Sequence, residues 1–224
     1  MESGAVPQSL ARLSVRNWPS PNFGERKDGL VPTIVVVHYT AMADPEAALL
    51  RLCDPSSEVS AHYLITRQGD VIRMVDETKR AWHAGNGEWR GLGDVNSRSI
   101  GIELDNAGDH PFSNPLMNAL EHLLRDVRTR WTIDAANVIG HSDMAPGRKS
   151  DPGPRFDWAR LARQGLAGPT EPVARQKSFA ETAKHAGFTA PCADDVLLNS
   201  VRLRFAPWRT GPLSEDDFRL CHSR

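Results

Sequence analysis

The sequence predicts an α/β protein with a mixed central β-sheet flanked by helices and a small helical appendage at the C-terminus. Three observations support this prediction. A continuous apolar run, TIVVVHYT at residues 33–40, suits a strand covered on both faces. The passage from SIGIELDN (99–106) through a long helical stripe to NVIG (137–140) suggests a right-handed crossover and parallel pairing of the two strands. SAHYLITRQGDVIRMV (60–75) reads as a hairpin, and its antiparallel pair makes the sheet mixed.

Local signals place the elements in order. Residues 20–31 are rich in Pro, Gly and charge and predict a surface loop. After the apolar strand, Asp44 and Pro45 form an N-cap and first-turn pair that opens a short helix. In the strand at 99–106, alternation puts apolar side chains on one face, while Gly101, Glu103 and Asp105 share the other.

The strongest helix signal begins at Asn114-Pro115 and keeps a period of about 3.6 residues. Its core-facing positions are Leu116, Leu120, Leu123, Leu124, Val127 and Trp131. We therefore divide the chain into a main catalytic domain at 1–165, a linker at 166–176 around GLAGPTEP, and a small helical region at 177–224. Capping-box patterns at Ser178 and Ser214 start two helices in that region, and Gly187 ends the first of them.

Composition narrows the class of protein. The 224 residues allow one good-sized core plus an appendage. The net charge is −1 and there is no long run of basic residues, so the sequence does not indicate nucleic-acid binding. No apolar run is long enough to span a membrane. The start, MESGAVPQSL, shows no signal peptide, so we expect a cytoplasmic protein, or a periplasmic or cell-envelope one if a signal sequence has been removed. The three cysteines are widely spaced, which argues against a disulfide framework and a cysteine-based zinc site.

Two of the eight histidines directly follow or end predicted strands. His38 lies where the apolar strand leaves the sheet, and His141 follows NVIG. Because ligands bind beyond the carboxyl ends of strands in open α/β sheets, the two side chains can converge there. Asp151 ends a ten-residue loop that starts at His141 and can fold back beside it. Two imidazoles and a carboxylate with an open fourth position are typical of catalytic zinc.

Spacing alone leaves two alternatives open. The histidines can be structural and the aspartate a surface residue, which the spacing by itself favours. Asp143, two residues after His141, can also compete with Asp151 as the third ligand.

Five segments in order resemble the zinc-dependent N-acetylmuramoyl-L-alanine amidases, the family that shares its fold with phage lysozyme-like amidases and peptidoglycan recognition proteins. They are TIVVVHYTAM, SAHYLITRQGDVI, RAWHAG, SIGIELDN and GHSDMAPGRKSDPG, and the resemblance covers about 18–161. It implies that His38, His141 and Asp151 bind one Zn²⁺ per chain and that Glu103 and Lys149 are catalytic. It also implies a mixed sheet flanked by helices.

One departure from the family pattern concerns which residue acts as the catalytic base. Phage-type members place a tyrosine before the histidine that matches His62, but Ala61 stands there in this chain. Glu103 must then supply the base, as in the bacterial recycling and cell-envelope branch. Recognition proteins that only bind lose a zinc ligand, whereas this chain keeps all three.

The implied reaction is hydrolysis of the amide bond between N-acetylmuramic acid and L-alanine in peptidoglycan or its muropeptide fragments. Glu103 would move the proton from water to the leaving amine, and Lys149 would stabilise the oxyanion. Trp82 and His83, in RAWHAG, are candidates for the substrate groove, whereas His62 is better explained as a packed residue.

The rival hypothesis is a peptidoglycan recognition protein whose zinc site is vestigial or structural. Within the enzyme hypothesis, the substrate is either a soluble anhydro-muropeptide or the intact wall. The region 177–224 is correspondingly either a wall-binding module or a structural cap held by Phe179, Phe188 and Phe205.

Overall fold

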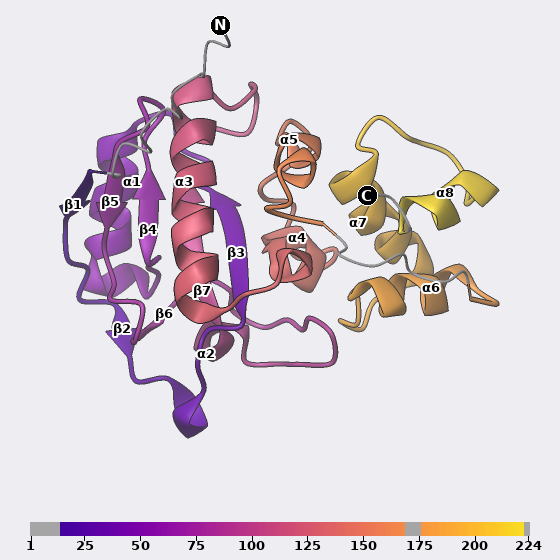
Figure 1. The fold of residues 1–224 in the computed structure, drawn as a ribbon, viewed down its shortest axis with the longest axis horizontal. Coiled ribbons are helices and arrows are strands. Elements are labelled where there is room, and N and C mark those ends of the chain that lie inside the picture. Colours follow the sequence, from indigo (N-terminus) through magenta and orange to yellow (C-terminus); the bar gives the residue numbers. More distant parts are fainter. Residues whose placement is uncertain (1–13, 169–175, 222–224) are drawn as a thin grey trace, which may run out of the picture.

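The computed structural model describes residues 14–168 and 176–221. Its centre is a six-stranded sheet in the order β1-β5-β4-β7-β3-β8, accompanied by the two-stranded sheet β2-β6 (Figure 1). The strands are β1 (Val15–Asn17), β2 (Phe23–Gly24), β3 (Ile34–Tyr39), β4 (Tyr63–Ile65), β5 (Val71–Arg73), β6 (Arg80–Ala81), β7 (Ser99–Leu104) and β8 (Val138–Gly140). The helices are α1 (Pro45–Cys53), α2 (Val95–Arg98), α3 (Asn114–Trp131), α4 (His141–Met144), α5 (Trp158–Arg163), α6 (Phe179–Ala186), α7 (Asp194–Phe205) and α8 (Glu215–Leu220).

The sheet is mixed, which confirms the predicted fold class. Strand β3 is parallel to both of its neighbours, β7 and β8, and β4 is parallel to β7. The hairpin β4–β5 is antiparallel, and its turn contains Gly69 at φ 91°. The sequence suggested that the strands on either side of α3 pair with each other. They do not: β7 and β8 are parallel but lie on opposite sides of β3, so the crossover skips one strand.

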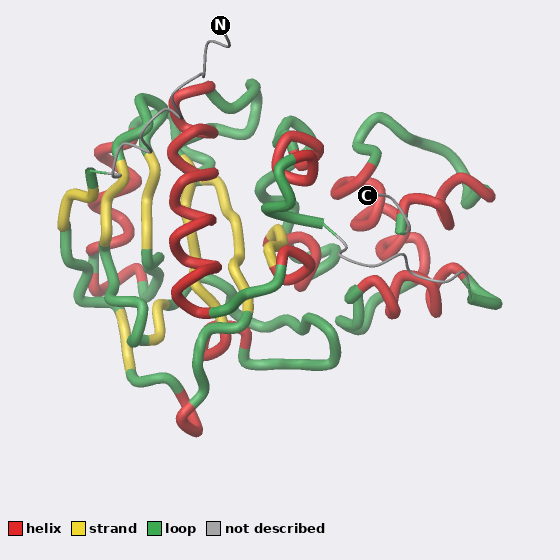
Figure 2. Tube along the Cα trace, viewed as in Figure 1, coloured by secondary structure: helices red, strands yellow, loops and turns green. Residues whose placement is uncertain are grey.

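Helix α3 covers one face of the sheet and runs along its strands (Figure 2). The hydroxyl of Ser113 accepts a hydrogen bond from the N–H of Leu116, and the helix stops where Thr132 adopts a left-handed conformation. The predicted apolar stripe of α3 is buried, apart from Trp131 at its end, which is partly buried. It packs against side chains that alternate along β3 and β7, such as Val35 and Ile102. Burying this stripe is the main stabilisation of the helix.

The opposite face of the sheet is divided between two groups of helices. Over β4 and β5, α1 packs Leu49 and Leu52 on the sheet, and Asp44 caps it as predicted. Over β3 and β8, α4 and the C-terminal helices share one apolar cluster with the sheet residues Ile34, Val36 and Ile139. The part of this face between the two groups holds the candidate site.

Two of the three C-terminal helices, α6 and α8, begin at the predicted capping boxes, at Ser178 and Ser214, and α6 ends at Gly187, whose φ is 118°. Helix α7 begins after Ala193, which provides no side-chain cap, and the sequence did not predict it. Phe179 and Phe188 are buried in the same cluster as the sheet residues, and Phe205 packs against it. Most of the predicted linker, residues 169–175, lies outside the described residues. Within the described ranges, no helix is long and apolar enough to cross a membrane.

Candidate active site

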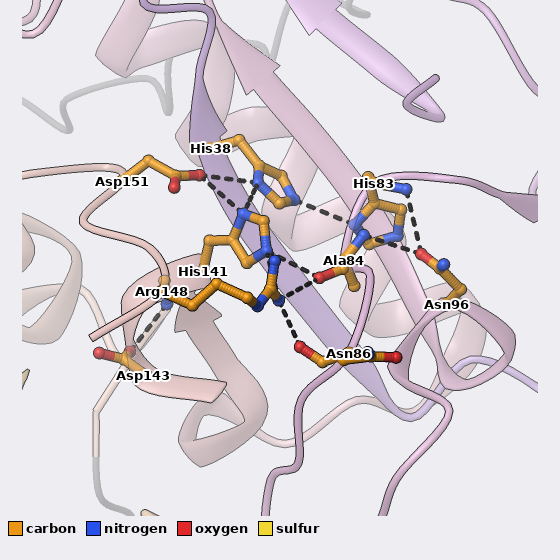
Figure 3. A network of polar contacts seen from close by, with 10 residues as sticks. His38, His83, Ala84, Asn86, Asn96, His141, Asp143, Arg148 and Asp151 are labelled. Atoms are coloured by element: carbon orange, nitrogen blue, oxygen red, sulfur yellow. Dashed lines mark hydrogen bonds and ion pairs between the residues drawn. The ribbon is translucent and has the colours of Figure 1, made fainter. Parts of the chain in front are cut away.

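Two neighbouring parallel strands bring the histidines together. Val37 of β3 pairs with Gly140 of β8, so the next residues, His38 and His141, lie side by side (Figure 3). His38 is still in the strand, whereas His141 is the first residue of α4. The loop after α4 returns to this point, where the N–H of Ser142 donates to the backbone carbonyl of Asp151 at 3.0 Å. That hydrogen bond places the Asp151 carboxylate beside both rings, as the sequence predicted.

Three potential ligand atoms converge on one point. Oδ2 of Asp151 lies 2.9 Å from Nδ1 of His38 and 3.1 Å from Nδ1 of His141, and the two nitrogens are 3.0 Å apart. Nε2 of His141 faces the backbone carbonyl of Ala84 at 2.8 Å. A carbonyl only accepts hydrogen bonds, so His141 donates from Nε2 and its Nδ1 carries a lone pair toward Asp151. Lone pairs in this arrangement repel unless a cation lies between them.

This donor set fits a metal ion. Both histidines are almost completely buried, and burial, reinforced by the neighbouring His141, lowers the pKa of His38 to about 4. His38 is therefore neutral near pH 7, the form that binds a metal. Within the described residues, His38, His141 and Asp151 are the group whose geometry suits a metal, with all ligand atoms within 4.8 Å of one another.

Glu103 lies next to the metal-binding group on the same face of the sheet. It is paired in register with His38 across β7 and β3, so both side chains project the same way. Its Oε2 atom is buried and has no hydrogen-bond partner among the described residues. Burial and, to a smaller extent, the charge of Asp151 raise the pKa of this carboxyl to about 8, against the opposing effect of Lys149.

These residues line a cleft of about 490 Å³, a size typical of ligand sites. Its base holds His38, His141, Asp151 and Glu103, and Lys149 lines it from the loop after α4. Trp82 and His83 also line the cleft. All the residues proposed from the sequence as ligands, catalytic groups or substrate contacts therefore lie at one site.

The alternative ligand Asp143 is engaged elsewhere. Its Oδ2 atom accepts from the N–H of Gly140 at 2.8 Å and pairs with the Arg204 guanidinium at 3.0 Å. Arg204 comes from α7 and also donates to the carbonyl of Val138. Asp143 thus links α4, whose first residue is His141, to the C-terminal helix α7. Figure 3 shows Asp143 apart from the ligand group.

His62 is packed beneath the site, as the sequence indicated. Its ring is fully buried, and its Nδ1 atom accepts from the N–H of Gly101 at 2.9 Å. Burial lowers the pKa of His62 to about 4, so the ring is neutral. It is an internal support of β7.

Sequence reasoning missed two arginines that hold the segments around the site, Arg148 and Arg204. Arg148 donates to the backbone carbonyls of Ala84 and Asn86, which fixes the loop opposite the ligands (Figure 3). Its position beside Lys149 in GRKSDPG was the available signal. Arg204 lies far along the chain, in α7, and offered no signal in the sequence.

Comparison with known proteins agrees with this site. Residues 28–154 match the model of the N-acetylmuramoyl-L-alanine amidase family. The chain is 40% identical over 181 residues to the N-acetylmuramoyl-L-alanine amidase AmiD of Escherichia coli, a match that covers 74% of this chain and 62% of AmiD. It is 36% identical over 166 residues to the 1,6-anhydro-N-acetylmuramyl-L-alanine amidase AmpD of E. coli, covering 66% of this chain and 91% of AmpD.

Solved structures show the same architecture. E. coli AmiD, in complex with the substrate anhydro-N-acetylmuramic acid-L-Ala-D-γ-Glu-L-Lys, superposes with a TM-score of 0.73 at 29% identity, covering 85% of this chain and 86% of that one. AmpDh3 of Pseudomonas aeruginosa, in complex with anhydromuramic pentapeptide, gives 0.74 at 26% identity, covering 91% and 92%. The family model spans more than half of the 224 residues, and its range includes all five candidate metal and catalytic positions, with Asp151 close to its end. The chain therefore belongs to the N-acetylmuramoyl-L-alanine amidase family.

Proposed function

We propose that this chain is a zinc-dependent amidase that hydrolyses the bond between N-acetylmuramic acid and L-alanine in peptidoglycan or its muropeptide fragments. One observation carries the proposal. Two imidazole nitrogens and a carboxylate oxygen converge at the base of a cleft, beside a buried carboxyl group and a lysine. The substrate class is supported by the names of the relatives and by the anhydro-muropeptides bound in the AmiD and AmpDh3 structures.

Zinc suits the donor set. Two neutral imidazoles and one carboxylate are a common zinc set, and three protein ligands leave one position open for water or substrate. His38, His141 and Asp151 would hold the ion. When bound, Zn²⁺ polarises a carbonyl and lowers the pKa of water to about 7.

Glu103 moves the proton in this reaction. Its carboxyl group lies on β7 beside His38 of the neighbouring strand β3, and its buried Oε2 atom has no hydrogen-bond partner among the described residues. Because burial raises its pKa to about 8 in the metal-free protein, the group holds a proton more readily than an exposed glutamate. It takes a proton from the attacking water and delivers it to the amine of the leaving L-alanine.

Lys149 stabilises the negative charge that develops on the carbonyl oxygen. Its ammonium group cannot bind a metal while protonated, so its role differs from that of Asp151 two residues later. The N–H of Lys149 donates to the carbonyl of Ala145 at 3.1 Å, which closes the turn and sets its backbone on the rim of the cleft. The positive charge of its ammonium group, carried by a loop that lines the cleft, favours the negative charge of the oxyanion.

Trp82 lines the cleft between the ligand group and α1. A half-buried aromatic face suits the apolar face of a sugar ring or the side chain of L-alanine. His83 lies deeper, against His38. We therefore assign contact with substrate to Trp82 first.

The experiment is product analysis on two substrates. Zinc-loaded protein is incubated with an anhydro-muropeptide and, separately, with purified sacculi, and the released stem peptide is identified by mass spectrometry. We expect free peptide beginning with L-alanine, and the faster of the two reactions identifies the substrate form. Glu103→Gln, which removes no ligand, is the control and should release the peptide about 10²–10⁴ times more slowly. A protein that binds muropeptide but never cleaves it would instead be a recognition protein.

A further inference from the structure

The segment from Trp82 to Gly85 contacts both histidine ligands on the side away from Asp151. Ala84 offers its backbone carbonyl to Nε2 of His141 at 2.8 Å. His83 offers its ring, with Nδ1 at 3.0 Å from Nε2 of His38 (Figure 3). One short loop therefore contacts the outer nitrogen of each ligand.

The direction of the His83 contact follows from the next residue in the network. Ser99 Oγ lies 2.6 Å from the carbonyl of Val95 and 3.1 Å from Nε2 of His83. A hydroxyl has one proton, and the carbonyl can only accept, so Ser99 donates to Val95 and accepts from His83. The His83 proton is then on Nε2, and its Nδ1 is an acceptor. His38 must donate to it from Nε2, which leaves the lone pair of His38 on Nδ1, facing Asp151.

The position of His83 is fixed by packing as well. A Cβ atom at residue 101 would lie 2.4 Å from Cγ of the His83 ring, so Gly101 provides the space in which the ring lies over the sheet. The backbone N–H groups of His83 and Ala84 both donate to Oδ1 of Asn96, at 3.0 and 2.8 Å. The His83 ring is thus held by its close packing on Gly101 and by its hydrogen bond with Ser99, and Asn96 holds the backbone of the same residue.

We propose that His83 is a positioning residue for the metal centre: the Ser99–His83 pair holds His38 in the tautomer whose Nδ1 lone pair faces the metal. This inference rests on the proposed metal site and deepens it. It also explains why a histidine lies in this loop, since a neutral imidazole can accept at one nitrogen while donating at the other. Partners of this kind fix the ring orientation and raise the basicity of a metal ligand.

The test measures zinc affinity by competition with a chromophoric chelator. In His83→Phe the acceptor for His38 is lost while the ring volume is kept, and we expect zinc to bind about 10–100-fold more weakly. In His83→Asn, the side-chain oxygen takes the place of Nδ1 and should restore most of the affinity. His185→Phe, the same change at an exposed histidine of α6 that does not line the cleft, should bind zinc as the wild type does.

A spectroscopic measurement separates positioning from simple loss of structure. Imidazole nitrogen NMR shifts of the zinc-free protein should show His38 protonated at Nε2 in the wild type and a mixture of tautomers in Ser99→Ala. Wild-type zinc affinity in His83→Phe, or an unchanged His38 tautomer in both variants, would overturn the inference and leave the amidase proposal intact. A wild-type protein that binds no zinc would overturn both.

Discussion

Replacing Glu103 by Gln should stabilise the zinc-free protein while it removes the proposed base. The Glu103 carboxyl group is buried beside Asp151, and its Oε2 atom has no partner in the described part of the chain. Burial raises its pKa to about 8, so the folded protein holds a proton that the unfolded chain releases at lower pH. The site therefore costs stability at the pH where it would work, a trade-off common to active sites.

The size and sign of the effect follow from linkage. A folded-state pKa above the unfolded value of 4.5 gives stability that is fully present below pH 4.5 and is lost as the pH rises toward about 8. The difference between the two pKa values corresponds to about 5 kcal/mol. Water at the mouth of the cleft screens part of this, so we expect Glu103→Gln to gain about 2–4 kcal/mol above pH 8.

Urea unfolding of the zinc-free wild type and Glu103→Gln between pH 5 and 9 measures this difference. The gain should grow with pH across that range, because only the wild-type side chain titrates. Glu25→Gln, at an exposed carboxylate that pairs with Lys79, controls for the loss of one surface charge. A variant that is less stable than the wild type at pH 9, or a difference that stays constant from pH 5 to 8, would refute this reasoning. In the zinc-loaded enzyme, the same substitution should lower turnover by about 10²–10⁴.

Three further substitutions separate the roles of other residues. Asp151→Ala should lose zinc and activity together, which metal analysis beside a rate assay would show; full zinc occupancy would rule Asp151 out as a ligand. Lys149→Ala should keep its zinc and turn over about 10²–10³ more slowly, with partial recovery in Lys149→Arg, and loss of the metal would contradict an oxyanion role. Arg204→Met should leave the Asp143 carboxylate buried and unpaired and destabilise the fold by about 3–5 kcal/mol in urea unfolding, an effect that Arg204→Met with Asp143→Asn should largely reverse.

Much of the fold was predictable because local signals and burial agreed. The period of the helix from Asn114, the alternation around Glu103 and the capping residues Asp44 and Ser178 each correspond to an element in the structure. Strand order was less predictable, since β3 lies between two strands that the chain joins through α3. A crossover fixes the relative direction of two strands but not whether a third strand lies between them.

The candidate site was predictable where chemistry and strand ends coincide, as at His38 and His141. The residues that orient these ligands were not, because their roles come from tertiary contacts. Ser99 reads as the first residue of a strand, and Arg204 as one of several arginines in a helix. The role of His83 became visible only from the direction of its hydrogen bonds to His38 and Ser99.

Titration of zinc into metal-free protein, with release of stem peptide from an anhydro-muropeptide as the readout, tests the central claim most directly. If His38, His141 and Asp151 form one catalytic metal site, the rate should rise in proportion to added zinc, reach its maximum at one ion per chain, and fall to background on chelation. A rate that does not depend on zinc would contradict the account. So would a protein that binds one zinc ion tightly and leaves the amide bond intact.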